Sequence, residues 1–127
     1  MRPNILTVDD SKGMRLMVQQ ALSAFDCDVN EASNGFNAFF AIERAKTDLI
    51  LLDVSMPVMD GLETLSRLKA APELAGIPVI MLTSPADHAV IPQLAGMGAI
   101  GTLMKPFDET ALVEAVRRVL KLKPAGK

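Results

Sequence analysis

The strongest constraint on the fold is a set of four short apolar runs, at residues 5–8, 49–52, 79–82 and 103–104, each followed by a polar side chain. The residues that follow them are Asp9 and Asp10, Asp53, Thr83 and Lys105. Runs rich in Leu, Ile and Val without polar alternation are typical of strands buried on both faces of a parallel sheet. Because parallel strands end at the same edge, where open α/β sheets bind ligands, we expect these side chains to converge at one site.

The segments between the runs have the apolar spacing of α-helices. This spacing predicts helices over residues 14–22, 38–45, 62–68 and 112–120, and a weaker helix between Asp87 and Gly96. Ser11 and Asp108 are placed to cap the first and the last of them. Residues 27–32 are predicted to form a further strand. This segment is too polar for the middle of a sheet, so we expect it at an edge. The alternation predicts a doubly wound α/β fold, a parallel sheet with helices on both faces.

Length and composition limit the organisation of the chain. Its 127 residues, of which 50% are hydrophobic, fit one domain, which we expect over residues 1–122, with residues 123–127 as a flexible tail. The net charge of −2 gives no support for binding to nucleic acid or to an anionic membrane. No apolar run is long enough for a signal peptide or a membrane span, and the single cysteine, Cys27, excludes an internal disulfide, so we expect a cytoplasmic protein.

The three carboxylates expected at this edge would raise one another's proton affinity unless a cation lies among them. Mg²⁺, or the similar Mn²⁺, suits such a site because it prefers oxygen ligands in octahedral geometry. Taken alone, Thr83 would be a hydroxyl bonded to the backbone and Lys105 a surface residue. The functional interpretation therefore depends on their combination with the three acids.

Four motifs lie where the predicted strands end. They are Val8-Asp9-Asp10-Ser11, Leu52-Asp53-Val54-Ser55-Met56-Pro57-Val58-Met59-Asp60-Gly61, Leu82-Thr83-Ser84 and Met104-Lys105-Pro106-Phe107. Together they resemble the response-regulator receiver domains of two-component signalling, and are similar to the single-domain chemotaxis-type regulators, over residues 4–120. The resemblance implies a five-stranded, flavodoxin-like sheet with the strand order 2-1-3-4-5.

The resemblance also implies roles for the acids. Asp53 would accept a phosphoryl group from a sensor histidine kinase or a histidine phosphotransfer protein. Asp10, Asp53 and the backbone carbonyl of Ser55 would bind Mg²⁺ (or Mn²⁺), with Asp9 acting through water. An aspartate is a competent nucleophile for phosphoryl transfer, in which positioning and charge neutralisation supply most of the catalysis.

Thr83 and Lys105 would supply further neutralisation of the transferred group, and the resemblance implies a cis peptide bond between Lys105 and Pro106. The phosphorylated chain would switch the binding of an unknown downstream protein. It would not be an enzyme beyond its own phosphoryl transfer and autodephosphorylation.

Two residues depart from the family pattern. Thr102 stands where most members carry Tyr or Phe, so the aromatic rotamer switch is absent. Pro92 falls inside the predicted fourth helix, which we expect to be short, kinked or late in starting. We therefore expect phosphorylation to alter mainly residues 84–98.

Two other functions are compatible with an aspartate at the end of a strand. A Mg²⁺-dependent aspartyl phosphohydrolase would usually carry a second acid two residues later as a general acid, where this chain has Ser55. A binding-only pseudo-receiver is disfavoured because every reactive position is present.

Overall fold

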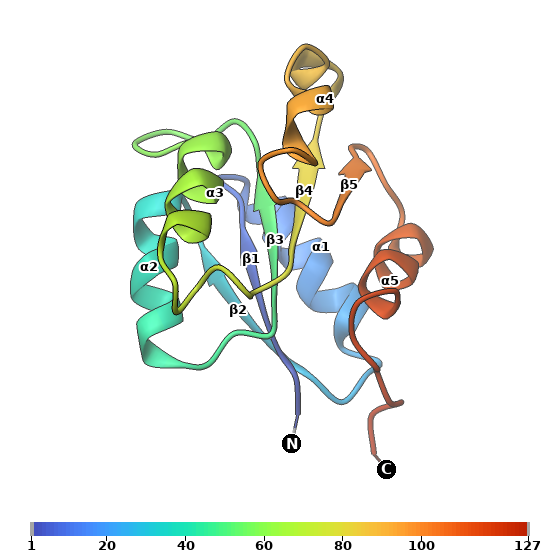
Figure 1. The fold of residues 1–127 in the computed structure, drawn as a ribbon. Helices are drawn as coiled ribbons and strands as arrows, with labels where there is room; N and C mark the ends of the chain where they lie inside the picture. Colours follow the sequence, from blue (N-terminus) through green and yellow to red (C-terminus); the bar gives the residue numbers. More distant parts are fainter. Residues whose placement is uncertain (1, 127) are drawn as a thin grey trace.

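Three of the four apolar runs form the interior of a parallel sheet (Figure 1), whereas the fourth, at residues 103–104, lies on an edge strand with Met104 exposed, so its predicted burial on both faces is wrong. The computed structural model describes residues 2–126. Its strands are β1 (Asn4–Val8), β2 (Asp28–Ala32), β3 (Leu49–Asp53), β4 (Val79–Thr83) and β5 (Gly101–Met104). Their order is β2-β1-β3-β4-β5 and every pair is parallel, which confirms the predicted fold and strand order. Every residue of β1, β3 and β4 is buried, whereas β2 and β5 form the partly exposed edges.

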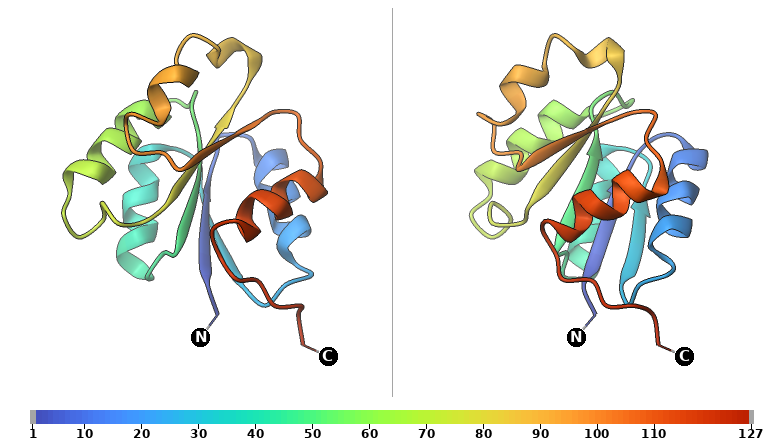
Figure 2. Two further views of the ribbon diagram at one scale, coloured as in Figure 1. Left: turned by 45° about the vertical axis from the view of Figure 1, so that its right-hand side comes forward. Right: turned by 90° about the vertical axis from the view of Figure 1, so that its right-hand side faces the viewer.

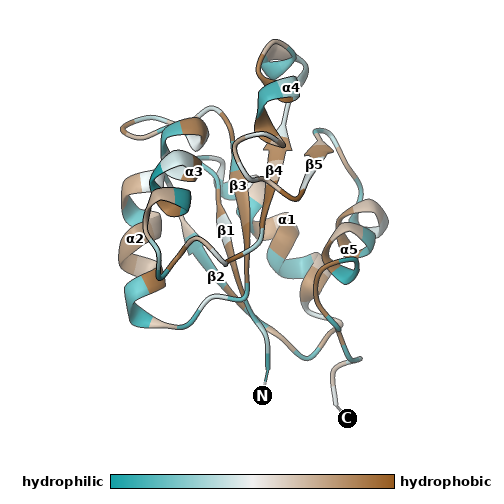
Figure 3. Ribbon diagram, in the orientation of Figure 1, coloured by the Kyte–Doolittle hydropathy of each residue, from teal (hydrophilic) through white to brown (hydrophobic). Residues whose placement is uncertain are grey.

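Helices cover both faces of this sheet, as Figure 2 shows. They are α1 (Lys12–Leu22), α2 (Gly35–Arg44), α3 (Gly61–Ala70), α4 (Ile91–Leu94) and α5 (Glu109–Arg117). Successive strand residues point to opposite faces, so Leu6 and Val8 pack with α2 and α3 while Ile5 packs with α1 and α5. Figure 3 shows hydrophobic residues along β3 and β4, and a mixture of hydrophobic and hydrophilic residues in the helices.

The four longer helices begin at side chains that bond their first turn. Ser11, Asn34, Asp60 and Asp108 each accept a hydrogen bond from the backbone N–H three residues later. Each bond satisfies a donor that the helix itself leaves free. The predicted caps at Ser11 and Asp108 are confirmed.

The fourth helix is short and starts late, as Pro92 predicts. A 3₁₀ helix, η1 (Pro85–Asp87), follows β4, and α4 begins only at Ile91. Pro92 therefore lies in the first turn of α4, where a helix does not use the N–H that proline lacks. The proline fixes where the helix begins and so shortens it.

The segment after α5 lies beside the turn before β2. The N–H of Asp26 donates to the carbonyl of Lys123 at 2.7 Å, and that of Ala125 to the carbonyl of Ala24 at 2.9 Å. These contacts involve the segment that the sequence predicts as a flexible tail, and its flexibility stays a prediction. Within residues 2–126, no helix has the length and apolar character needed to cross a membrane.

Candidate functional site

The carboxyl ends of four strands bring the five predicted side chains to one edge of the sheet. Asp9 and Asp10 follow β1, Asp53 and Thr83 are the last residues of β3 and β4, and Lys105 follows β5. The ammonium Nζ of Lys105 lies 2.8 Å from Asp9 Oδ2 and 3.1 Å from Asp53 Oδ1. The structure thus places the lysine between two acids that lie 44 residues apart in the sequence.

Strand register sets these positions. Val8 pairs with Leu52, so Asp9 lies beside Asp53 where the two strands end. Thr83 pairs with Met104, and the N–H of Lys105 donates to the carbonyl of Thr83 at 2.6 Å, which continues the β4–β5 pairing by one residue. The peptide bond after Lys105 is cis, as the family resemblance implies.

Gly61 allows α3 to begin close to the end of β3. Its N–H donates to the carbonyl of Val54 at 2.7 Å, and a Cβ at this position would collide with the backbone of Asp53. Only glycine fits this approach. The loop from Asp53 to Gly61 is therefore held against the strand that carries the central acid.

Burial controls the protonation of the central acid. Asp53 has a side chain that is 7% exposed, and burial raises its pKa to about 6, with the charge of Asp9 adding to the rise and that of Lys105 opposing it. Burial alone would lower the pKa of Lys105. The hydrogen bonds and charges of Asp9 and Asp53 outweigh that effect, so the pKa of Lys105 lies above its usual range.

The three carboxylates have the composition of a site for a hard cation. Asp9, Asp10 and Asp53 each offer a carboxylate oxygen, and these oxygens lie within 4.8 Å of one another. Asp9 is fully buried, and its two oxygens accept bonds from Ser11 N and Lys105 Nζ, whereas Asp10 is exposed. An all-oxygen donor set with an open side fits Mg²⁺, which keeps several waters when few carboxylates bind it.

Thr83 has a weakly held hydroxyl. Its side chain is buried, and Oγ1 lies 3.8 Å from the thioether Sδ of Met104, its hydrogen-bond acceptor. A thioether is a weak acceptor, so this bond is easily exchanged for one to an anionic oxygen. Thr102 is exposed on the edge strand β5.

Asp87 is a buried acid near the site that the sequence analysis did not single out. Its Oδ1 accepts a hydrogen bond from Ser55 Oγ at 2.9 Å, and its Oδ2 accepts from Ser84 N at 2.8 Å and Ser84 Oγ at 3.1 Å. Ser84-Pro85-Ala86-Asp87 has the spacing of a capping box, which is the signal that could have identified the local bonds. The bond to Ser55 has no such signal, because it joins residues 32 positions apart.

Comparison with known proteins gives one consistent result. The sequence model of the family described as response regulator receiver domain matches residues 5–117. The sporulation initiation phosphotransferase F of Bacillus subtilis is 34% identical over 123 residues, which cover 97% of this chain and 98% of that protein. The chemotaxis protein CheY of Halobacterium salinarum is 32% identical over 94% of this chain and 98% of its own length.

Solved structures agree with the sequence relatives. The chemotaxis response regulator CheY4 of Vibrio cholerae superimposes with a TM-score of 0.86 at 32% identity, over 94% of this chain and all of that one (100%). A putative response regulator from Chloroflexus aurantiacus gives a TM-score of 0.86 at 28% identity, over 94% of this chain and 98% of that one. The family match, over residues 5–117, includes the strand ends that carry the acids.

Proposed function

The chain belongs to the response regulator receiver domain family, and from this premise we propose that Asp53 is its phosphoacceptor. The donor is a phosphohistidine of a sensor histidine kinase or a histidine phosphotransfer protein, and the phosphorylated chain binds a downstream protein differently. The observation that carries the proposal is the position of Asp53, a buried carboxylate held between Lys105 and two further acids.

The reaction forms a bond between a carboxylate oxygen of Asp53 and phosphorus and breaks the bond from phosphorus to the histidine nitrogen. The electron pair of the broken bond stays on that nitrogen, so the imidazole leaves as a neutral base once it has taken a proton. Asp53 must be ionised to attack, and a pKa of about 6 leaves it mostly ionised at neutral pH. Lys105 favours this ionised form.

Cationic groups and a hydroxyl donor then stabilise the negative charge of the transferred phosphoryl group. Mg²⁺ bound by Asp10, Asp53 and the Ser55 carbonyl, with Asp9 acting through water, would neutralise the phosphoryl oxygens. Lys105 can move its ammonium from the carboxylate to a phosphoryl oxygen. Thr83 exchanges its weak bond to Met104 for a stronger one to the anion, because a charged acceptor strengthens a hydrogen bond.

A receiver role is favoured over the two alternatives. Ser55 occupies the place where an aspartyl phosphohydrolase would carry its general acid, and its hydroxyl already donates to Asp87. A binding-only pseudo-receiver has no use for a partly buried lysine that bridges two acids. We also propose that the protein acts in the cytoplasm, as its unpaired Cys27 favours, and has no enzymatic activity beyond self-catalysed phosphoryl transfer and autodephosphorylation.

The test is incubation with acetyl phosphate and Mg²⁺, followed by intact-mass spectrometry. The wild-type chain should gain one phosphoryl group, and Asp53→Asn or addition of EDTA should abolish the gain. Asp60→Asn is the matched control, because Asp60 lies in the same loop but caps α3. A phosphorylated Asp53→Asn, an unchanged rate in EDTA, or steady turnover of small phosphate esters would reject the proposal.

A further inference from the structure

Asp87 joins two loops that flank the phosphoacceptor. Ser55 lies two residues after Asp53, and Ser84 directly follows Thr83. The carboxylate of Asp87 binds both serines, with one oxygen directed to each. It therefore connects the segment that follows the phosphoacceptor with the segment that follows Thr83.

A helix cap alone does not explain this arrangement. Asp87 is 7% exposed, and burial of a carboxylate is costly unless hydrogen bonds satisfy it. The bonds to Ser84 would cap η1 equally well with the second oxygen in solvent. Instead that oxygen accepts the hydroxyl of Ser55 from a loop on the neighbouring strand.

The two loops are otherwise separated by an open groove. The groove has a volume of about 430 Å³, and Ser55, Met56, Asp60, Ala86, Asp87 and Val90 are among the residues that line it. The bond from Ser55 to Asp87 is a direct polar link across this groove. The backbone carbonyl of Asp87 also accepts a hydrogen bond from the N–H of Val90 at 2.9 Å, and Val90 is the residue immediately before α4.

We propose that Asp87 is a positioning residue that fixes Ser55 beside the phosphoacceptor and couples occupancy of the site to residues 84–90. This inference rests on the proposed function, because the Ser55 carbonyl acts there as a ligand of the cation. When that carbonyl takes a cation, the Ser55 hydroxyl moves with its backbone and carries the carboxylate of Asp87 along. Asp87 thus provides a route from the site to α4 that does not need an aromatic residue at position 102.

Two substitutions of Asp87 separate coupling from simple packing. Asp87→Asn keeps both links, because its carbonyl oxygen accepts from Ser84 while its amide donates to the Ser55 hydroxyl, which can also accept. Asp87→Leu keeps the branching and the number of side-chain heavy atoms but makes neither bond. Asp108→Leu is the control for the loss of a helix cap, since Asp108 caps α5 by a single bond to Ala111 N.

The measurement is a titration of the full chain with Mg²⁺, followed by amide NMR shifts. In the wild type and in Asp87→Asn, amides of residues 84–90 should shift with the same midpoint as those beside Asp53. In Asp87→Leu, the amides beside Asp53 should still shift, with Mg²⁺ affinity weakened by about tenfold, as is typical when the support of a metal ligand is lost. Residues 84–90 should then stay silent, whereas Asp108→Leu should respond as the wild type does.

Ser55→Ala removes the same bond from the other side and keeps the backbone carbonyl, so it answers the question if Asp87→Leu fails to fold. In Ser55→Ala too, the amide signals of residues 84–90 should not shift when Mg²⁺ is added. A wild-type response of these residues in either Asp87→Leu or Ser55→Ala overturns the coupling while leaving phosphorylation of Asp53 standing. A wild-type chain in which no amide responds to Mg²⁺ would instead reject the cation site of the proposed function.

Discussion

The two ends of the sheet both gather charged side chains, but they differ in burial. At the carboxyl end, the ion pairs join Lys105 to Asp9 and Asp53, whose side chains are 0 and 7% exposed. At the amino end, Arg2 lies 2.6 Å from Asp26 and 3.3 Å from Asp28, and these three side chains are 43–60% exposed. The raised pKa values of Asp53 and Lys105 belong to the buried end. Burial, more than the number of charges, thus distinguishes a reactive cluster from a solvated one.

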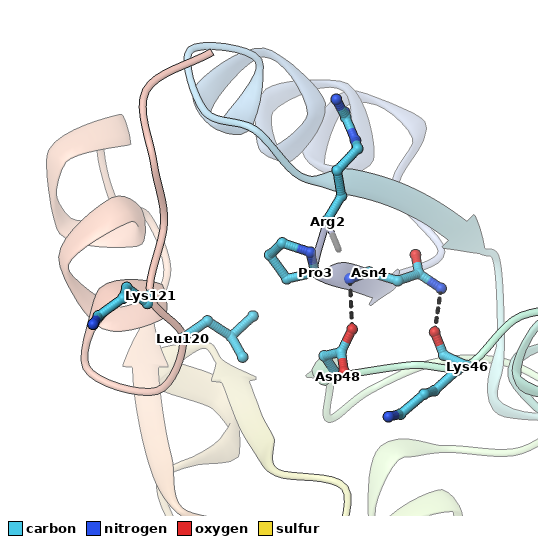
Figure 4. A pocket seen from close by; sticks show the side chains of 7 residues that line it. All are labelled: Arg2, Pro3, Asn4, Lys46, Asp48, Leu120 and Lys121. Carbon is cyan, nitrogen blue, oxygen red and sulfur yellow. Dashed lines mark hydrogen bonds between the residues drawn. The ribbon is translucent and has the colours of Figure 1, made fainter. Parts of the chain in front are cut away.

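The amino end also contains a pocket, which Figure 4 shows from close by. It has a volume of about 380 Å³ and is lined by Arg2, Pro3, Asn4, Lys46, Asp48, Leu120 and Lys121. Within it Asn4 N donates to Asp48 Oδ2 at 2.8 Å and Asn4 Nδ2 to the carbonyl of Lys46 at 2.7 Å (Figure 4). These bonds fix the start of β1 beside the chain that enters β3. The hydrogen bonds of Asn4 in this pocket therefore support the fold.

The largest difference between the two ends should appear when each loses its cation. Lys105→Met leaves Asp9 and Asp53 buried without their cation, and should lower the free energy of unfolding by about 3 kcal/mol at pH 8 without Mg²⁺. Arg2→Met removes an exposed partner and should cost less than about 1 kcal/mol. Urea unfolding followed by circular dichroism measures both. Equal losses at the two ends would show that burial does not separate them.

The pH dependence of stability should follow Asp53. Its folded pKa of about 6 lies above the ordinary value, so the folded state binds more protons than the unfolded state between about pH 4 and pH 6. The contribution of Asp53 to stability is therefore complete below this window and is lost as the pH rises through 6. Metal-free Asp53→Asn should lack this loss and exceed the wild type at pH 8 by roughly 2 to 3 kcal/mol.

Urea unfolding of metal-free protein from pH 4 to pH 8 checks this prediction. Asp28→Asn is the matched control at the amino end, because Asp28 is an exposed acid that pairs with Arg2. It should retain the wild-type slope. The prediction is wrong if Asp53→Asn keeps that slope as well.

Mg²⁺ should raise the stability of the folded chain, and this gain should depend on acids at the carboxyl end only. A ligand that binds only the folded state at ten times its dissociation constant adds about 1.4 kcal/mol, which corresponds to a rise in Tm of about 5 °C for a domain of this size. Asp10→Asn should remove most of the rise in Tm, because it removes the charge of one of the three carboxylates that could hold the cation. Asp26→Asn, at the amino end, should leave it unchanged in calorimetric scans with and without Mg²⁺.

Sequence was sufficient for the features that depend on periodic burial. The continuous apolar runs of β1, β3 and β4 identify strands covered on both faces, and the shared edge of parallel strands then brings Asp9 and Asp53 together. The cap at Ser11 and the late start of α4 at Pro92 follow equally from local backbone chemistry. These features need no knowledge of how loops pack.

Features formed between loops were beyond the sequence analysis. The bond from Ser55 to Asp87 depends on how two loops face each other across a groove, which no spacing records. Strand ends are placed by ladder hydrogen bonds, but loops are placed by packing of their own side chains. The contacts of residues 123–126 with the turn before β2 belong to the same class.

Backbone strain gives the smallest predicted effect, and it too lies at the carboxyl end. Val58, in the loop between Asp53 and α3, has a φ of 70° and is 80% exposed, and it is the one non-glycine residue with positive φ in residues 2–126. With the bond from the Met59 N–H to the carbonyl of Pro57, this φ describes a γ-turn centred on Val58, a strained conformation that costs roughly 1 to 3 kcal/mol and that a β-branched side chain tolerates poorly.

The neighbouring bonds impose this conformation. Met59 donates its N–H to the carbonyl of Pro57 at 2.8 Å, and its own carbonyl accepts the N–H of Gly35 at 3.2 Å, so both sides of the turn are held. Asparagine adopts a positive φ more readily than a β-branched residue does, and Val58→Asn should therefore raise the free energy of unfolding by about 1 kcal/mol. Ile100→Asn, another exposed position but one without positive φ, should give no gain in the same urea titration. A gain at Ile100 equal to that at Val58 would assign the effect to lost surface hydrophobicity, and the strain would then not distinguish the carboxyl end.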